Sequence, residues 1–138
     1  MPAPSAECVR LFADKGGDKI YAALIKGMHS RIAKGLVFED PKSTCVHVNA
    51  GKGGTAYAGV HPRKGGVLLT IVAAAPLKSK RIRNALRRSA NRCYCDLLLS
   101  SEAEVDDELL GWLEDAARLV SEPRSKAKKP ARRKSATS

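Results

Sequence analysis

The sequence predicts an α+β fold, in which an antiparallel sheet of about four strands packs against helices. Three short β-branched or apolar segments follow one another in the chain, and the glycine-rich turns between them are only a few residues long. Turns this short join antiparallel strands, because a parallel pair needs a crossover of a dozen residues or more. Segments with helical periodicity stand before and after these strands. We therefore expect the order α-β-β-β-α-β-α in one domain over residues 1–122.

The N-terminal part predicts a short helix and then a longer one. Ser5 is placed to cap a helix that runs through Phe12, and Asp18 is placed to cap a second helix that Gly35 ends. An apolar residue recurs every four positions in the second helix, which predicts that this face covers an apolar surface. These residues are Ile20, Leu24, Met28 and Ile32.

Three strands are expected at residues 44–48, 55–61 and 67–73, with glycine-rich turns between them. The first turn contains Gly51-Lys52-Gly53-Gly54, which is superficially similar to a phosphate-binding loop. It lacks the spacing of that motif and stands between two strands rather than before a helix. We therefore interpret it as a hairpin turn.

The second half predicts a basic helix, a fourth strand and an acidic helix. Ser79 is placed to cap a helix running to about Arg88, and a strand at 92–99 follows. Ser101 and Glu104 have the spacing of a capping box for the last helix. The basic helix would present an apolar edge to the sheet, consisting of Ile82, Ala85 and Leu86.

Charge is strongly segregated along the chain. Residues 41–95 contain 11 Lys and Arg and no Asp or Glu, whereas residues 96–122 contain 9 acidic residues and 1 basic residue. Residues 123–138 add 7 basic residues without apolar periodicity, so we expect a disordered basic tail there. A basic surface with a basic tail concentrates anions, and a nucleic-acid backbone is the first candidate.

The favoured interpretation is non-catalytic, largely sequence-independent association with nucleic acid through phosphate contacts, with duplex DNA as the favoured form. The alternative is a protein- or small-ligand-binding module with incidental surface charge, in which the acidic last helix contacts a protein partner. The third hypothesis is that the protein is an enzyme. The candidate nucleic-acid-binding residues are Lys52, Arg63, Lys64, Lys80, Arg81, Arg83, Arg87, Arg88, Lys128, Lys129, Arg132, Arg133 and Lys134.

His61 is the one candidate general base, because it precedes Pro62 at the edge of a turn. No carboxylate exists in residues 41–95 to orient it, so a partner would have to come from Asp96 or from the last helix. The same lack of clustered carboxylates argues against a metal-dependent nuclease. The catalytic residues are therefore left unknown.

Two cysteine-containing pairs raise the question of a metal site. Cys45 with His47, and Cys93 with Cys95, would supply four ligands if their strands were neighbours. Structural zinc sites use wider Cys spacings, and Cys93 and Cys95 fall on the expected core face of their strand. We therefore expect buried reduced thiols, with no metal and no cofactor.

The sequence also bears on location. Its longest apolar stretch, 67–76, is about half the length of a membrane-spanning helix, and its first residues do not resemble a signal peptide. We therefore expect a cytoplasmic protein without a membrane partner.

Several motifs taken together resemble the DUF5655 family, a domain of unknown function with some members labelled predicted transport proteins. They are Tyr57-Ala58-Gly59-Val60-His61-Pro62-Arg63-Lys64, Ser79-Lys80-Arg81-Ile82-Arg83, Ser89-Ala90-Asn91-Arg92 and Val105-Asp106-Asp107-Glu108-Leu109-Leu110-Gly111-Trp112-Leu113. The resemblance covers roughly residues 42–117. It implies a compact α+β fold and adds no catalytic residue. Many relatives would have histidine after Tyr94, where this chain has Cys95 and Asp96.

Overall fold

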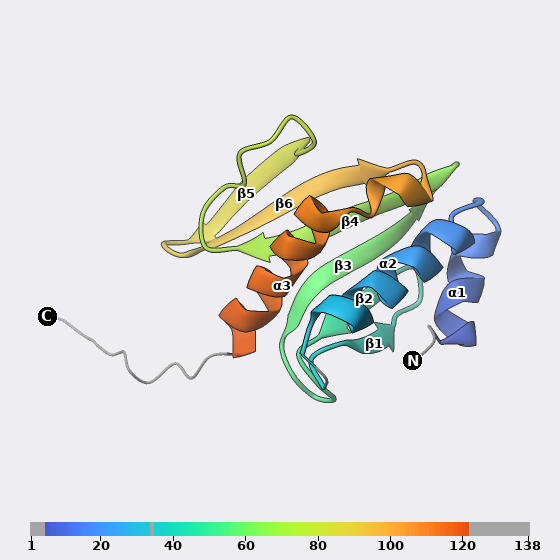
Figure 1. Cartoon of the computed structure of the whole chain (residues 1–138), viewed down its shortest axis with the longest axis horizontal. Coiled ribbons are helices and arrows are strands. Elements are labelled where there is room, and N and C mark those ends of the chain that lie inside the picture. Colours follow the sequence, from blue (N-terminus) through green and yellow to red (C-terminus); the bar gives the residue numbers. More distant parts are fainter. Residues whose placement is uncertain (1–4, 34, 122–138) are drawn as a thin grey trace, which may run out of the picture.

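A computed structural model describes residues 5–33 and 35–121 and contains a six-stranded antiparallel sheet with helices on one face (Figure 1). The strand order is β1-β2-β3-β4-β6-β5. The predicted α+β class is confirmed, but the prediction of four strands is wrong. The elements are α1 (Ala6–Ala13), α2 (Asp18–Arg31), β1 (Phe38–Pro41), β2 (Val46–Asn49), β3 (Ala56–Arg63), β4 (Gly66–Ala73), β5 (Asn84–Ser89), β6 (Arg92–Leu99) and α3 (Asp107–Ser121).

The helices α1 and α2 form where the sequence predicts them, although their caps differ. The apolar stripe of α2 is buried as expected. Ser5 makes no side-chain cap; its backbone N–H instead donates to the Glu39 carboxylate. Phe12 stacks on Tyr21 with 4.5 Å between ring centroids, which joins α1 to α2. None of the helices over the described ranges is long and apolar enough to cross a membrane.

The last helix begins later than predicted. The capping box of Ser101 and Glu104 exists, but it closes a single 3₁₀ turn, Glu102–Glu104. The cap of α3 is Asp106, whose Oδ1 accepts a hydrogen bond of 3.1 Å from the Leu109 N–H. The acidic residues therefore lie at the N-terminal end of α3, where the helix dipole favours negative charge.

The predicted helix at 79–88 is wrong. Residues 84–89 form the edge strand β5, which pairs antiparallel with β6 and places Leu86 opposite Tyr94. The spacing of Ile82 and Leu86 fits a helix, but pairing with β6 satisfies the backbone groups along the outer edge of that strand. Leu86 is consequently 50% exposed instead of packing into the sheet.

The strand β1 is a second difference from the predicted fold, because no strand was expected at residues 38–41. It lies at the other edge of the sheet and pairs with β2. Its sequence, Phe38-Glu39-Asp40-Pro41, is poor in strand formers, and Pro41 is tolerated because an edge strand needs hydrogen bonds on one side only. Both missed strands are thus edges, where partner strands and not local preference decide the structure.

Candidate functional site

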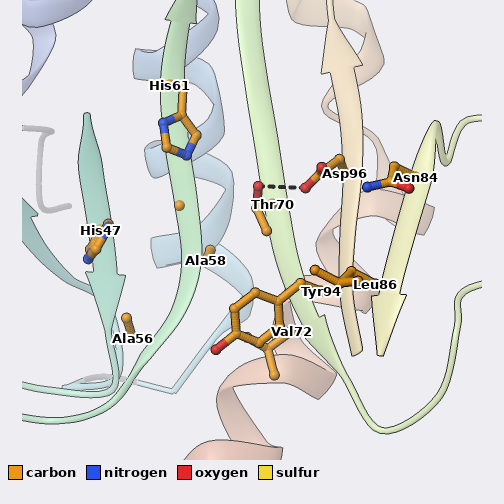
Figure 2. A pocket seen from close by; sticks show the side chains of 11 residues that line it. His47, Ala56, Ala58, His61, Thr70, Val72, Asn84, Leu86, Tyr94 and Asp96 are labelled. Atoms are coloured by element: carbon orange, nitrogen blue, oxygen red, sulfur yellow. Dashed lines mark hydrogen bonds between the residues drawn. The ribbon is translucent and has the colours of Figure 1, made fainter. Parts of the chain in front are cut away.

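In the part of the chain that the structure describes, α1, α2 and α3 all lie on one face of the sheet (Figure 1). Along β6 the fully buried residues are Cys93, Cys95, Leu97 and Leu99, as the predicted alternation requires. Every second residue, including Tyr94, points to the opposite face. In Figure 2 that face is toward the viewer and the helices lie behind the strands. We call this surface the open face.

A row of polar residues crosses the open face from one edge of the sheet to the other. Each strand contributes one residue, and the residues are successive Cα partners in the sheet register. Except for one glycine, every member has a polar or charged side chain. The row consists of Asp40, His47, Gly59, Thr70, Asp96 and Asn84.

The glycine leaves a hollow in the middle of this row. A Cβ on Gly59 would lie 3.5 Å from Nε2 of His61 and 3.9 Å from Cδ2 of His47, so both rings border the missing side chain (Figure 2). The resulting hollow has a volume of about 390 Å³. Binding sites for small ligands are commonly of this size.

One carboxylate lies in the hollow. The Thr70 hydroxyl donates a hydrogen bond of 2.7 Å to Oδ1 of Asp96, shown as the dashed line in Figure 2. Asp96 is the single acidic residue among those that line the hollow. The hollow therefore offers a fixed acceptor-only group to a ligand.

His61 points into the same hollow as Asp96, which the sequence analysis named as one possible carboxylate partner for this histidine. Burial lowers the pKa of the His61 imidazole, the nearby charges of Arg63 and His47 lower it further, and Asp96 opposes them. The ring is thus neutral at pH 7 and has one donor and one acceptor nitrogen. The side-chain hydrogen bond of Asp96 goes to Thr70 and not to His61.

Apolar side chains flank the polar row. Leu86, Tyr94 and Leu98 are 50%, 41% and 37% exposed, and they are the large hydrophobic residues most open to solvent in the described chain. Leu86 and Tyr94 face each other on β5 and β6, and Leu98 follows Asp96 on the same face. These three side chains give the open face its exposed apolar surface beside the polar row.

Cations stand at two ends of the open face. A second depression, of about 530 Å³, adjoins the hollow through Asn84 and Asp96 and is lined by Arg63, Lys64 and Arg83. At the other end the Arg88 guanidinium lies 5.5 Å from the centroid of the Tyr94 ring. None of these four cations forms an ion pair with a residue in the described ranges.

The remaining predicted cations are placed elsewhere. Arg81 donates to Asp106, Glu108 and the Glu104 carbonyl, and its guanidinium lies 5.8 Å from the Trp112 ring centroid. Arg87 pairs with Cys93 and so belongs to the helix-covered face. Lys52 and Lys80 are exposed in loops. Lys128, Lys129, Arg132, Arg133 and Lys134, with the rest of the predicted tail, lie outside the described residues.

The structure separates the four residues considered for a metal. His47 lies on the open face of β2, whereas Cys93 and Cys95 lie on the helix-covered face of β6, with two strands between them. In the part of the chain that the structure describes, no three side chains of the metal-binding types come close enough to hold an ion. An alternation with Thr44, Val46 and Val48 on the core face would turn Cys45 away from the core, but Cys45 is buried.

Sequence reasoning missed Thr70, Asn84 and Tyr94 as site residues. The sequence did contain a signal for Thr70, which is a polar residue in the middle of an otherwise apolar strand. Asp96 interrupts β6 in the same way. What the sequence lacks is the register that aligns them.

No family model, curated protein or solved structure matches the chain. The resemblance to the DUF5655 family therefore stays a prediction from the quoted motifs.

Proposed function

We propose that the protein associates non-catalytically with nucleic acid through the open face. The observation that carries this proposal is the arrangement of that face, where exposed apolar groups lie between three cations at one end and Arg88 at the other, none of them in an ion pair with a described residue. The sequence-based proposal placed the contact on a basic helix, and we transfer it to the sheet because residues 84–89 form β5.

The chemistry of the face suits a polyanion with flat apolar groups. Arg63, Lys64 and Arg83 are available to phosphates at one end, and Arg88 at the other. Between them Tyr94 exposes an aromatic ring, on which a base stacks with little regard to its identity. Recognition of single strands on sheets combines these two kinds of contact.

The proposal is non-catalytic because of the bonding in the hollow. A catalytic base is commonly oriented by a hydrogen bond to a second group, and among the described residues the Asp96 carboxylate has a side-chain hydrogen bond with Thr70 and none with His61. The Asp40 carboxylate beside His47 is bonded to Lys42, with 3.0 Å between Nζ and Oδ2. Neither carboxylate therefore holds a histidine for proton transfer.

The test compares two double variants with the same net charge. Arg63→Glu with Arg83→Glu reverses charge on the open face, and Lys19→Glu with Lys26→Glu reverses it on exposed positions of α2. Binding of a labelled single strand is measured by fluorescence anisotropy at several salt concentrations. We expect the first pair to weaken binding and to flatten the slope of log K against log salt by about 1.4, at about 0.7 for each phosphate contact. If the two double variants bind with equal affinity and equal salt slope, the open face is not the surface that binds nucleic acid.

A small-ligand-binding module is the second candidate, and the hollow over Gly59 favours it. An apolar ligand in a hollow of about 390 Å³ would bind with little salt dependence. A thermal-shift panel of uncharged metabolites at low and high salt distinguishes it from the polyanion proposal. A salt-independent rise of the melting temperature would place the small-ligand module first.

A further inference from the structure

We infer that the hollow over Gly59 receives one unpaired base of a single strand, and that it favours a base with an exocyclic amino group. This inference rests on the proposed function and names the form of nucleic acid that the open face takes. It differs from the sequence-based expectation, which favoured duplex DNA.

The first argument is the placement of charge. Asp96 carries the one carboxylate that lines the hollow, and no Lys or Arg lines it, so a phosphate inside it would meet a like charge with no cation beside it. Asp96 also lines the adjoining depression, but there Arg63, Lys64 and Arg83 outnumber its single negative charge. A bound strand is therefore oriented with its phosphates at the rim and an uncharged group in the hollow.

The second argument is shape. The hollow exists because Gly59 has no side chain, and it is bordered by the rings of His47 and His61 (Figure 2). A base enters such a recess only when it is unpaired and turned out of a stack, because a duplex keeps its bases inside. A flat ring in the recess would contact the imidazoles, and the Tyr94 ring lines the same hollow.

The third argument is hydrogen bonding. Thr70 occupies Oδ1 of Asp96, which leaves the second carboxylate oxygen to accept from a ligand. A carboxylate accepts from the amino group of cytosine, whereas uracil presents a carbonyl oxygen at the equivalent position. Two acceptors placed against each other repel. The hollow should therefore distinguish two bases of nearly equal size.

The experiment uses the full-length protein and labelled oligo-dC and oligo-dU of about 12 nucleotides, a length within the site sizes of single-strand binders. We expect oligo-dC to bind more tightly by about fivefold or more. Asp96→Asn should bring the ratio of the two affinities close to one, because an amide also donates. Asp40→Asn is the matched control, since it removes a carboxylate from the same polar row outside the hollow and should keep the ratio.

Gly59→Ala gives an independent measurement. The added Cβ would make ordinary contacts of 3.5 Å and 3.9 Å with the two histidines, so the fold should be kept while the space between the two rings is reduced. We expect weaker binding of oligo-dC and unchanged binding of a duplex that contacts only the cations.

The outcomes separate the inference from the proposed function. If neither oligonucleotide binds at low salt, the proposed function fails. If both bind equally to the wild-type protein, or if Asp40→Asn lowers the ratio as much as Asp96→Asn, the base-binding hollow is refuted and association through phosphates stands. A Gly59→Ala protein that binds oligo-dC with wild-type affinity also refutes it.

Discussion

Thr70 and Asp96 face each other across β4 and β6, with 2.7 Å between the threonine hydroxyl and Oδ1 of the carboxylate. The pair stands at the centre of a polar row that crosses six strands, on the face that the helices leave uncovered. The hydrogen bond from Thr70 fixes the orientation of the Asp96 carboxylate. The carboxylate can still accept a hydrogen bond from a second group.

Thr70→Val should destabilise the protein by about 1 kcal/mol, because it leaves a partly buried carboxylate without its donor. Thr70→Ser keeps the hydroxyl and is the control. Urea denaturation followed by circular dichroism gives both values. Equal stability of the valine and serine variants would mean that the hydrogen bond contributes nothing to folding.

Two glycines of the sheet should respond differently to the same substitution. A Cβ on Gly66 would collide with the Leu99 carbonyl oxygen, so Gly66→Ala should cost about 1–3 kcal/mol through overpacking. Gly59→Ala meets only ordinary contacts and should stay within about 1 kcal/mol of wild type. Thermal denaturation of the two variants tests this order, which a more stable Gly66→Ala protein would contradict.

Arg81 should act as a structural residue, in contrast to Arg88. Its guanidinium joins the turn before β5 to Asp106 and Glu108 at the start of α3, at 2.9 Å and 3.2 Å. Since these acids are about half exposed, we expect Arg81→Ala to cost only about 1 kcal/mol, less at high salt. Arg88→Ala should change stability by less than about 0.5 kcal/mol. Unfolding curves at two salt concentrations measure both, and an Arg81→Ala protein as stable as wild type would count against the assignment.

His61 should make the protein less stable in mild acid. Its pKa in the folded protein is lowered from the ordinary value of 6.5 by burial, by Arg63 and by His47, so the unfolded chain binds the proton first. Stability is therefore unaffected well above 6.5 and is lost as the pH falls through 6.5 toward the folded pKa. The free energy of unfolding of His61→Gln, measured between about pH 8 and 5, should fall less steeply than that of wild type. Parallel curves would show that His61 titrates alike in both states.

The sequence by itself determined α1, α2, most of α3 and the central strands. The stripe of α2 and the alternation of β6 predicted which residues are buried, because burial against a single apolar layer imposes the period of the element on its sequence. Glycine-rich turns placed β3 and β4 beside each other, since a short connection leaves no other neighbour. These properties depend on residues close together in the chain.

The tertiary structure alone decided the edges and the site. Residues 84–89 have good helix formers and a helix-like spacing, yet pairing with β6 makes them a strand, because partners outside the segment outweigh local preference. The same pairing aligns Asn84 with Asp96, and β4 then aligns Asp96 with Thr70. A shift of one residue in the register of any strand would turn its polar residue to the other face. The polar row therefore follows from registers set between distant segments, which no local pattern in the sequence encodes.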